Sequence, residues 1–272
     1  VVSASAGRCV AGPGAWCSVN IILLHPEDAR GDDGARYSVS DRRARHLREV
    51  LGADVTDEIR VGLVDGPLGT AEIVRRDDDG IELDCRWTEP APRPWLDLVL
   101  AVPRPKQLRK LLPQITALGL RRLTFLRTWR VQRPYLGSPL LEAEGHADLI
   151  EEGLMQAGRT AWPRVRRFDR FEDFCADATA RAARVGTRLL ADPRAPTDLA
   201  ERTTPLDTPT ELVVGPEGGL LPYEVERLVE DVRTIIAQRA ATKGLQLSTE
   251  IASDVPYFLL TDPVKLKQIL LN

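Results

Sequence analysis

The chain has 272 residues, of which 43% are hydrophobic and 28% are charged, and its formal net charge is −3. This composition predicts a globular protein with room for two modest domains. It excludes a protein built around membrane spans, because no run of about 18 apolar residues occurs. The four cysteines and three histidines follow no metal-ligand spacing. They therefore predict reduced thiols in a cytoplasmic protein without a metal site.

The first part of the chain carries mainly β-strand signals. Residues 1–18 are small and unpatterned, which predicts a disordered leader. From residue 19 to residue 90, short apolar or alternating runs separated by turns predict a small β-barrel. Ser40 is well placed to cap a short helix that runs to Leu51. We expect the strands of this domain at 19–24, 58–64, 70–74 and 81–85.

Strand and helix signals alternate in a second domain, which we expect at residues 91–228 after a proline-rich linker. The alternation is typical of an α/β domain with a mostly parallel sheet. The expected strands are 96–102, 123–126, 188–191 and 212–214, and the expected helices are 106–118, 140–157, 171–184 and 220–228.

A glycine-rich loop follows the last of these strands. Its residues are Gly215, Pro216, Glu217, Gly218 and Gly219. Glycines leave the backbone open to a ligand, and such a loop between a strand and a helix predicts a binding crevice at the carboxyl end of the sheet. The alternative is a tight β–α turn that binds nothing.

Positive charge gathers in one part of this otherwise acidic chain. Residues 93–135 contain ten Lys or Arg residues and one acid, Asp97, which is a local net charge of +9. This asymmetry favours a surface that faces phosphates. An ordinary solvated helix face is the alternative interpretation.

Several motifs in order connect these features to a known family. They are Asp41–Leu47 in the first domain, then Pro103–Lys106, Met155–Arg159, Leu190–Pro193 and finally the glycine loop. With them, the chain resembles the RsmE-type 16S ribosomal RNA uridine-N3 methyltransferases of the SPOUT class from about residue 19 to residue 228. The resemblance implies a PUA-like, RNA-binding β-barrel followed by an α/β domain with a deep trefoil knot.

The resemblance also implies a reaction and its partners. It implies that S-adenosylmethionine is the methyl donor, that a uridine N3 of 16S rRNA in the small ribosomal subunit is the acceptor, and that the protein is a homodimer. It assigns no general base. The residues implied for the cofactor are Leu190, Gly215, Pro216, Glu217, Gly218 and Gly219, and those implied for RNA are Arg42, Arg43, Arg45, Arg104, Lys106, Arg109, Lys110 and Arg159.

The last part of the sequence departs from that family. The segment that closes the knot is not found after Leu228, so the resemblance implies a knot domain without its C-terminal segment. Residues 229–272 are instead similar to the part of sensor histidine kinases that leads into the ATP-binding domain. Besides a methyltransferase, the sequence thus leaves open a catalytically inactive RNA-binding module and a histidine kinase fragment.

Overall fold

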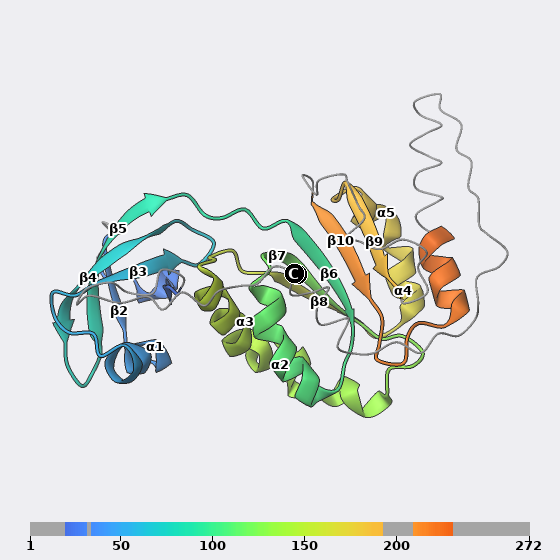
Figure 1. Ribbon diagram of the computed structural model, residues 1–272, viewed down its shortest axis with the longest axis horizontal. Coiled ribbons are helices and arrows are strands. Elements are labelled where there is room, and N and C mark those ends of the chain that lie inside the picture. Colours follow the sequence, from blue (N-terminus) through green and yellow to red (C-terminus); the bar gives the residue numbers. More distant parts are fainter. Residues whose placement is uncertain (1–19, 32–33, 193–208, 231–272) are drawn as a thin grey trace, which may run out of the picture. The chain divides into compact units, whose positions relative to one another are not determined.

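The computed structural model describes residues 20–31, 34–192 and 209–230 (Figure 1). The chain forms two compact units, one made of residues 1–92 with 155–160 and one of residues 93–154 with 161–272. The predicted leader, and all but two residues of the kinase-like segment at 229–272, lie outside the described residues.

The first unit is built on a five-stranded sheet with the order β1-β3-β4-β5-β2. Strand β1 pairs in parallel with β3, and the other neighbours are antiparallel. Alternate residues face one apolar core, for example Ala71 and Ile73 on β4, as expected for strands with a period of two. The strands are β1 (Ile22–Leu24), β2 (Arg36–Val39), β3 (Glu58–Leu63), β4 (Leu68–Arg76) and β5 (Ile81–Glu89).

A short helix, α1 (Arg42–Arg45), follows β2 and continues into a single π-helical turn, η2 (His46–Val50). The expected cap at Ser40 is wrong, because Asp41 caps this helix. Its carboxylate accepts a hydrogen bond from the backbone N–H of Arg43 at 2.8 Å. Asp41 can do so because its side chain is one residue closer to the first free N–H groups of the helix. A further short turn, η1 (Pro26–Asp28), follows β1.

The second unit is an α/β sandwich around a five-stranded parallel sheet with the order β8-β7-β6-β10-β9. This arrangement confirms the predicted α/β architecture with a parallel sheet. The strands are β6 (Leu96–Ala101), β7 (Leu120–Leu126), β8 (Arg164–Phe168), β9 (Thr187–Ala191) and β10 (Thr210–Val214). The helices are α2 (Pro105–Thr116), α3 (Ala143–Ala157), α4 (Phe171–Ala176), α5 (Ala178–Ala182) and the described helical residues 222–230.

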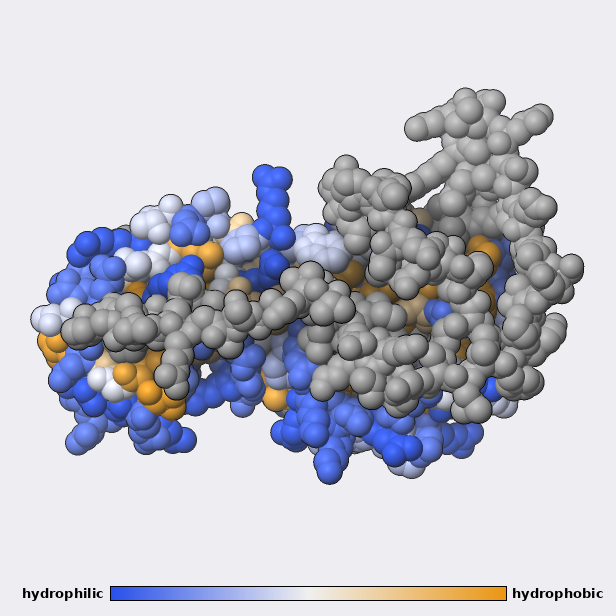
Figure 2. Space-filling view, in the orientation of Figure 1, coloured by the Kyte–Doolittle hydropathy of each residue, from blue (hydrophilic) through white to orange (hydrophobic). Residues whose placement is uncertain are grey.

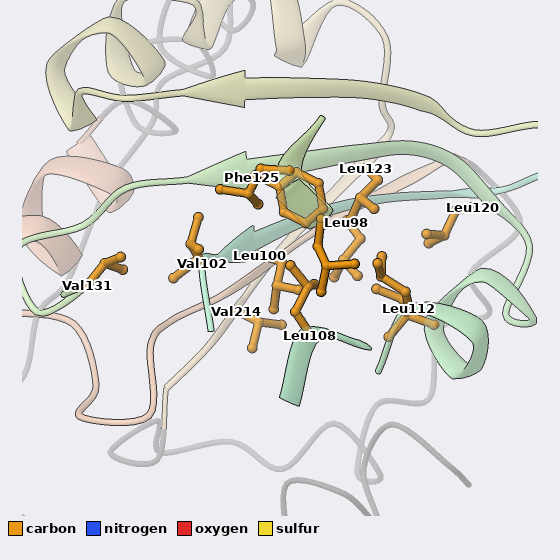
Figure 3. Packing of buried hydrophobic residues seen from close by; sticks show 14 of the residues in the cluster. Leu98, Leu100, Val102, Leu108, Leu112, Leu120, Leu123, Phe125, Val131 and Val214 are labelled. Carbon is orange, nitrogen blue, oxygen red and sulfur yellow. The ribbon is translucent and has the colours of Figure 1, made fainter. Parts of the chain in front are cut away.

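Both faces of this sheet are covered, and the alternation of side chains along each strand explains how. On one face, Leu98 and Phe125 pack against Leu108 of α2 (Figure 3). On the other face, Val99 and Val213 pack with residues of α4 and of the helix at 222–230. Every residue of β6 is buried, as expected for a parallel strand between two helical layers.

Three details of the second unit differ from the expected elements. The helix expected at 140–157 begins at Ala143, after the short turns η3 (Arg133–Gly137) and η4 (Pro139–Leu141). The helix expected at 171–184 is divided into α4 and α5 at Asp177, whose ψ of 2° leaves the helical region. Strand β8 was not expected, because three of its five residues are arginines.

The surface of the described residues is mainly hydrophilic on the face that Figure 2 shows, with small hydrophobic patches between the polar side chains. Within the described residues, none of the helices is long and apolar enough to cross a membrane.

Candidate functional site

The carboxyl ends of the five parallel strands lie at one edge of the second sheet. Strands β6, β7 and β8 follow one another in one direction across the sheet, whereas β10 lies on the opposite side of β6. The direction of the chain therefore changes between β6 and β10. In parallel α/β sheets, the loops on either side of such a point form the usual ligand crevice.

The loop after β10 holds the predicted glycines at this edge. Gly219 has a φ of +74°, which a residue with a side chain adopts only with strain, and its N–H donates to the carbonyl oxygen of Pro216 at 2.7 Å. The loop also contacts the neighbouring loop after β6, because the Glu217 carboxylate lies 3.2 Å from the Arg104 guanidinium. Both side chains are more than half exposed, so this pair contributes little to stability but connects the two loops.

The loop after β7 also reaches the glycine loop. The Arg130 guanidinium donates a hydrogen bond to the carbonyl oxygen of Gly218. A Cβ atom on Gly218 would lie 3.3 Å from Cδ of Arg130, so only a glycine lets the arginine pack this closely without adjustment. The loops after β6 and β7 therefore both contact the five-residue glycine loop that follows β10.

A buried carboxylate holds the loop after β7 against the start of the helix that follows the glycine loop. Glu224, in the helix that follows the glycine loop, is 0% exposed. Its Oε1 accepts from the backbone N–H of Trp129 at 2.9 Å, and its Oε2 accepts from the backbone N–H of Leu221 at 2.8 Å. The bond to Leu221 is half of a capping box, in which a glutamate three residues into a helix binds the N–H at the helix start.

The loop after β7 also carries a buried hydroxyl group whose hydrogen-bonding capacity is unused. Thr128 is 2% exposed, and among the described residues its Oγ1 has no hydrogen-bond partner. Buried hydroxyl groups are nearly always paired. Thr128, next to Trp129 and Arg130, therefore has a hydroxyl group with capacity for one further hydrogen bond.

Sequence reasoning missed Thr128, Trp129 and Glu224 as site residues. The spacing of Leu221 and Glu224 was a usable signal, since it matches a capping box. The contacts of Trp129 and Arg130 arise from the tertiary structure, and their distance of about 90 residues from the glycine loop leaves no local pattern. Leu190, which was predicted as a cofactor residue, lies within β9 opposite Val213 and packs on the α4 side of the sheet.

In the second unit, the predicted RNA-contacting residues gather on α2. Lys106, Arg109 and Lys110 are all exposed, and their spacing puts them on one side of the helix. Leu108, Leu112 and Ile115 fill the opposite, buried side. Arg104 immediately precedes this helix, so its contact with Glu217 joins the basic face to the glycine loop.

In the first unit, Arg43 does not fit the predicted role of an RNA contact. Its side chain is 5% exposed, and its guanidinium lies 2.6 Å from the Asp28 carboxylate and 2.9 Å from that of Asp41. Burial alone would lower the pKa of Arg43, but hydrogen bonds and charges from the two aspartates raise it above its ordinary value. Arg43 is therefore a structural residue of the core.

The other basic residues predicted for this unit are more accessible. Arg45 is exposed and Arg42 is half-buried on the same helix, α1. Arg159 is half-buried in the segment 155–160, and burial lowers its pKa.

A family model described as an RNA methyltransferase domain matches residues 89–237, which is more than half of the chain. The chain belongs to this family of RNA methyltransferases. The matched part of the RNA methyltransferase includes β6 to β10, the glycine loop, Thr128, Trp129 and Glu224.

A relative and several solved structures resemble this RNA methyltransferase. Ribosomal RNA small subunit methyltransferase E of Treponema pallidum (strain Nichols) is 29% identical over 164 residues, which is 59% of this chain. The match spans 61% of the length of that relative.

The solved structures share the fold at lower identity. The crystal structure of ribosomal RNA small subunit methyltransferase E from Neisseria gonorrhoeae, bound to S-adenosylmethionine, has a TM-score of 0.59 at 15% identity, over 83% of this chain and 98% of that chain. A Legionella pneumophila protein described as a methyltransferase, in complex with the same cofactor, has a TM-score of 0.56 at 18% identity, over 83% and 98% of the two chains.

Proposed function

We propose that this chain transfers a methyl group from S-adenosylmethionine to N3 of a uridine in 16S rRNA. The observation that carries the proposal is the glycine loop, which the loops after β6 and β7 contact at the carboxyl edge of the parallel sheet. Membership of the RNA methyltransferase family supports the reaction class. The Treponema pallidum relative supports ribosomal RNA as the substrate, and the two cofactor-bound structures of the same fold support the methyl donor.

The residues of the site fit such a cofactor. S-adenosylmethionine, when bound, supplies an electrophilic methyl group on a sulfonium centre. The backbone of Gly218 and Gly219 would approach it without side chains in between, and the unpaired hydroxyl of Thr128 would meet one of its polar groups. Of the predicted cofactor residues, Gly215, Pro216 and Glu217 complete the loop, and Leu190 would contribute an apolar contact from β9.

The basic residues would hold the RNA through its phosphates. In the second unit these are Arg104, Lys106, Arg109 and Lys110, and in the first unit Arg42, Arg45 and Arg159. Such contacts position an RNA without specifying its sequence. A homodimer in the cytoplasm, with a PUA-like barrel and a SPOUT-type knot domain that lacks its C-terminal closing segment, remains part of the proposal.

For methyl transfer, the main task of the protein would be to position the methyl donor and the uridine. Methyl transfer to uridine N3 would leave S-adenosylhomocysteine as the other product and release the N3 proton to water. Holding both partners in line supplies much of the rate enhancement in such transfers. The loops after β6, β7 and β10 would provide this alignment, because Glu224 and Arg130 restrain the loops after β7 and β10 and the Arg104–Glu217 pair connects the loop after β6 to them.

The experiment that tests the proposal combines binding and turnover. Calorimetric titration of the full chain with S-adenosylmethionine should give a dissociation constant in the micromolar range. Incubation with tritiated cofactor and small ribosomal subunits should label 16S rRNA, and mass spectrometry of the digested RNA should find 3-methyluridine.

A pair of glycine variants links these results to the loop. Gly219→Ala should abolish labelling, because the φ of +74° strains an alanine where the backbone meets the cofactor. Gly52→Ala places the same residue at a φ of +60° in the first unit with no atom within 4 Å, so it should bind the cofactor as the parent does. Equal cofactor affinity of both variants would reject the assignment of the loop.

Two other functions are outcomes of these measurements. Salt-dependent RNA binding without cofactor binding would identify a catalytically inactive RNA-binding module. The kinase alternative rests on residues 229–272, of which 231–272 lie outside the described part of the chain, and an ATP titration without a signal would reject it.

A further inference from the structure

The most exposed large hydrophobic side chain of the described residues lies beside the glycine loop. Trp129 is 75% exposed, compared with 69% for Val50 and 47% for Tyr223, the other exposed aromatic residue among them. An indole is among the largest apolar groups that a protein can bury. Leaving one in water is unfavourable, although Thr128 before it and Val131 two residues after it are only 2% and 5% exposed.

The backbone that carries this indole is fixed. The N–H of Trp129 donates to the buried Glu224 carboxylate at 2.9 Å, and the next residue, Arg130, binds the carbonyl oxygen of Gly218. The carbonyl oxygen of Thr128 accepts from the N–H of Val131 at 3.1 Å, which closes a tight turn around Trp129. The side chain is therefore displayed from a turn held at both ends.

The charges around the indole identify the kind of partner. Arg127, Arg130 and Arg133 lie on the same loop, and Arg130 and Arg133 are exposed. Two acids that contact this loop or the glycine loop are engaged, since the Glu224 carboxylate accepts from backbone N–H groups and Glu217 is paired with Arg104. An aromatic ring among unbalanced arginines complements a single-stranded nucleic acid, whose bases stack on the ring while its phosphates meet the cations.

We propose that Trp129 is a stacking platform for an unpaired base of the RNA substrate next to the glycine loop. This inference rests on the proposed function, because it takes RNA as the polymer that enters this edge of the sheet. Stacking on an aromatic side chain tolerates any base. Trp129 would thus hold an unstacked nucleotide in place, while the choice of nucleotide is made elsewhere in the site.

The test compares three variants of the full chain. Binding of a fluorescently labelled oligouridylate and of a 16S rRNA transcript is measured for Trp129→Ala, Trp129→Phe and Tyr223→Ala. Trp129→Ala should weaken binding roughly ten- to hundredfold, and Trp129→Phe should retain most of the affinity because a phenyl ring also stacks. Tyr223→Ala removes another exposed aromatic ring, which packs edge to face on Phe171, and should bind as the parent does.

Intrinsic fluorescence gives an independent readout. Oligouridylate should quench the emission of the parent protein more than that of Trp129→Phe, and the difference reports the indole at position 129. Equal quenching of both proteins, or an RNA affinity of Trp129→Ala within twofold of the parent, would overturn the proposal. So would a lower mass of Trp129→Ala in sedimentation, since the indole would then face a second copy of the chain.

Cofactor titration separates this inference from the proposed function. A parent protein that binds no S-adenosylmethionine but loses RNA affinity in Trp129→Ala would reject the methyltransferase proposal and support the platform. A parent protein that methylates RNA as well as its Trp129→Ala variant does would reject the platform and support the methyltransferase.

Discussion

The carboxylate of Glu224 accepts a hydrogen bond at 2.9 Å from the backbone N–H of Trp129, a residue 95 positions earlier in the chain. The same carboxylate holds the N–H of Leu221 at 2.8 Å, where the helix after the glycine loop begins. One buried side chain thus fixes two of the three loops that form the candidate site. Its loss should alter ligand binding without any direct contact between Glu224 and a ligand.

Glu224→Gln tests this positioning role. Glutamine has nearly the same shape, but its amide nitrogen cannot accept a hydrogen bond, so one of the two N–H groups loses its partner. Because hydrogen bonds to charged groups contribute about 1.5–3 kcal/mol, we expect cofactor affinity to fall about tenfold or more by calorimetry. Glu226→Gln, on the exposed side of the same helix, is the matched control. Parental affinity in both variants would contradict the role.

Arg43 and Arg45 lie on the same helix but should respond oppositely to substitution. Arg43→Ala leaves the Asp28 carboxylate, which is 12% exposed, without its cation, so the free energy of unfolding should fall by about 3–5 kcal/mol. Arg45→Ala should change it by less than about 0.5 kcal/mol and instead weaken RNA binding at low salt. Urea denaturation and an RNA titration measure the two effects. A stable Arg43→Ala protein with reduced RNA affinity would restore Arg43 as an RNA contact.

Gly153 lies where α3 packs on α2. A Cβ atom there would clash with the carbonyl oxygen of Pro113 and lie 2.9 Å from its carbonyl carbon. Alanine favours a helix by about 1 kcal/mol over glycine, but overpacking costs about 1–3 kcal/mol. The clash involves backbone atoms that cannot rotate away, so we expect Gly153→Ala to lower the melting temperature. Gly137→Ala, with no atom within 4 Å, should not lower it, and a stabilised Gly153→Ala would show that the helices can separate.

His146 should make stability depend on pH. Burial lowers its pKa below the ordinary 6.5, against the opposing effects of the Leu140 carbonyl oxygen, 3.2 Å away, and of the Glu142 charge. Below about pH 6.5 the unfolded chain binds the proton more readily than the folded one, so stability is full above this pH and falls on acidification. Denaturation between pH 5 and 8 should show this slope, and His146→Gln should reduce it. Identical slopes for the two proteins would contradict the assignment.

Sequence patterns were sufficient where an element is specified by its own residues. The apolar runs that became β6 and β10 and the helical periodicity of α2 have this property, since burial on one or both faces determines which residues occur there. Strand β8 does not. Its arginines suit a surface loop equally well, and it becomes a strand by pairing with the edge of β7.

The candidate site could be predicted only in part, for a related reason. The glycines at 215–219 are local signals, and the structure places them at the carboxyl end of β10 as expected. The resemblance assigned Arg43 to RNA together with Arg42 and Arg45, although the largely buried aspartate that pairs with it lies 15 residues earlier. Thr128 is singled out by the burial of its unpaired hydroxyl and Trp129 by its backbone contact with Glu224, and a sequence pattern encodes neither.

The position of β10 has a consequence for how the protein folds while it is being synthesised. Among the described strands of the second sheet it is the last to be synthesised, yet it lies between β6 and β9. Until residues 210–214 have left the ribosome, one edge of β6, a strand whose residues are all buried in the finished fold, is open, and β9 lacks the only strand that pairs with it in the described sheet. Open strand edges recruit other chains. Translation that pauses before Thr210 should therefore yield aggregation-prone nascent chains. Steady elongation through Val214 should shorten the time during which the edges of β6 and β9 are unpaired and can aggregate.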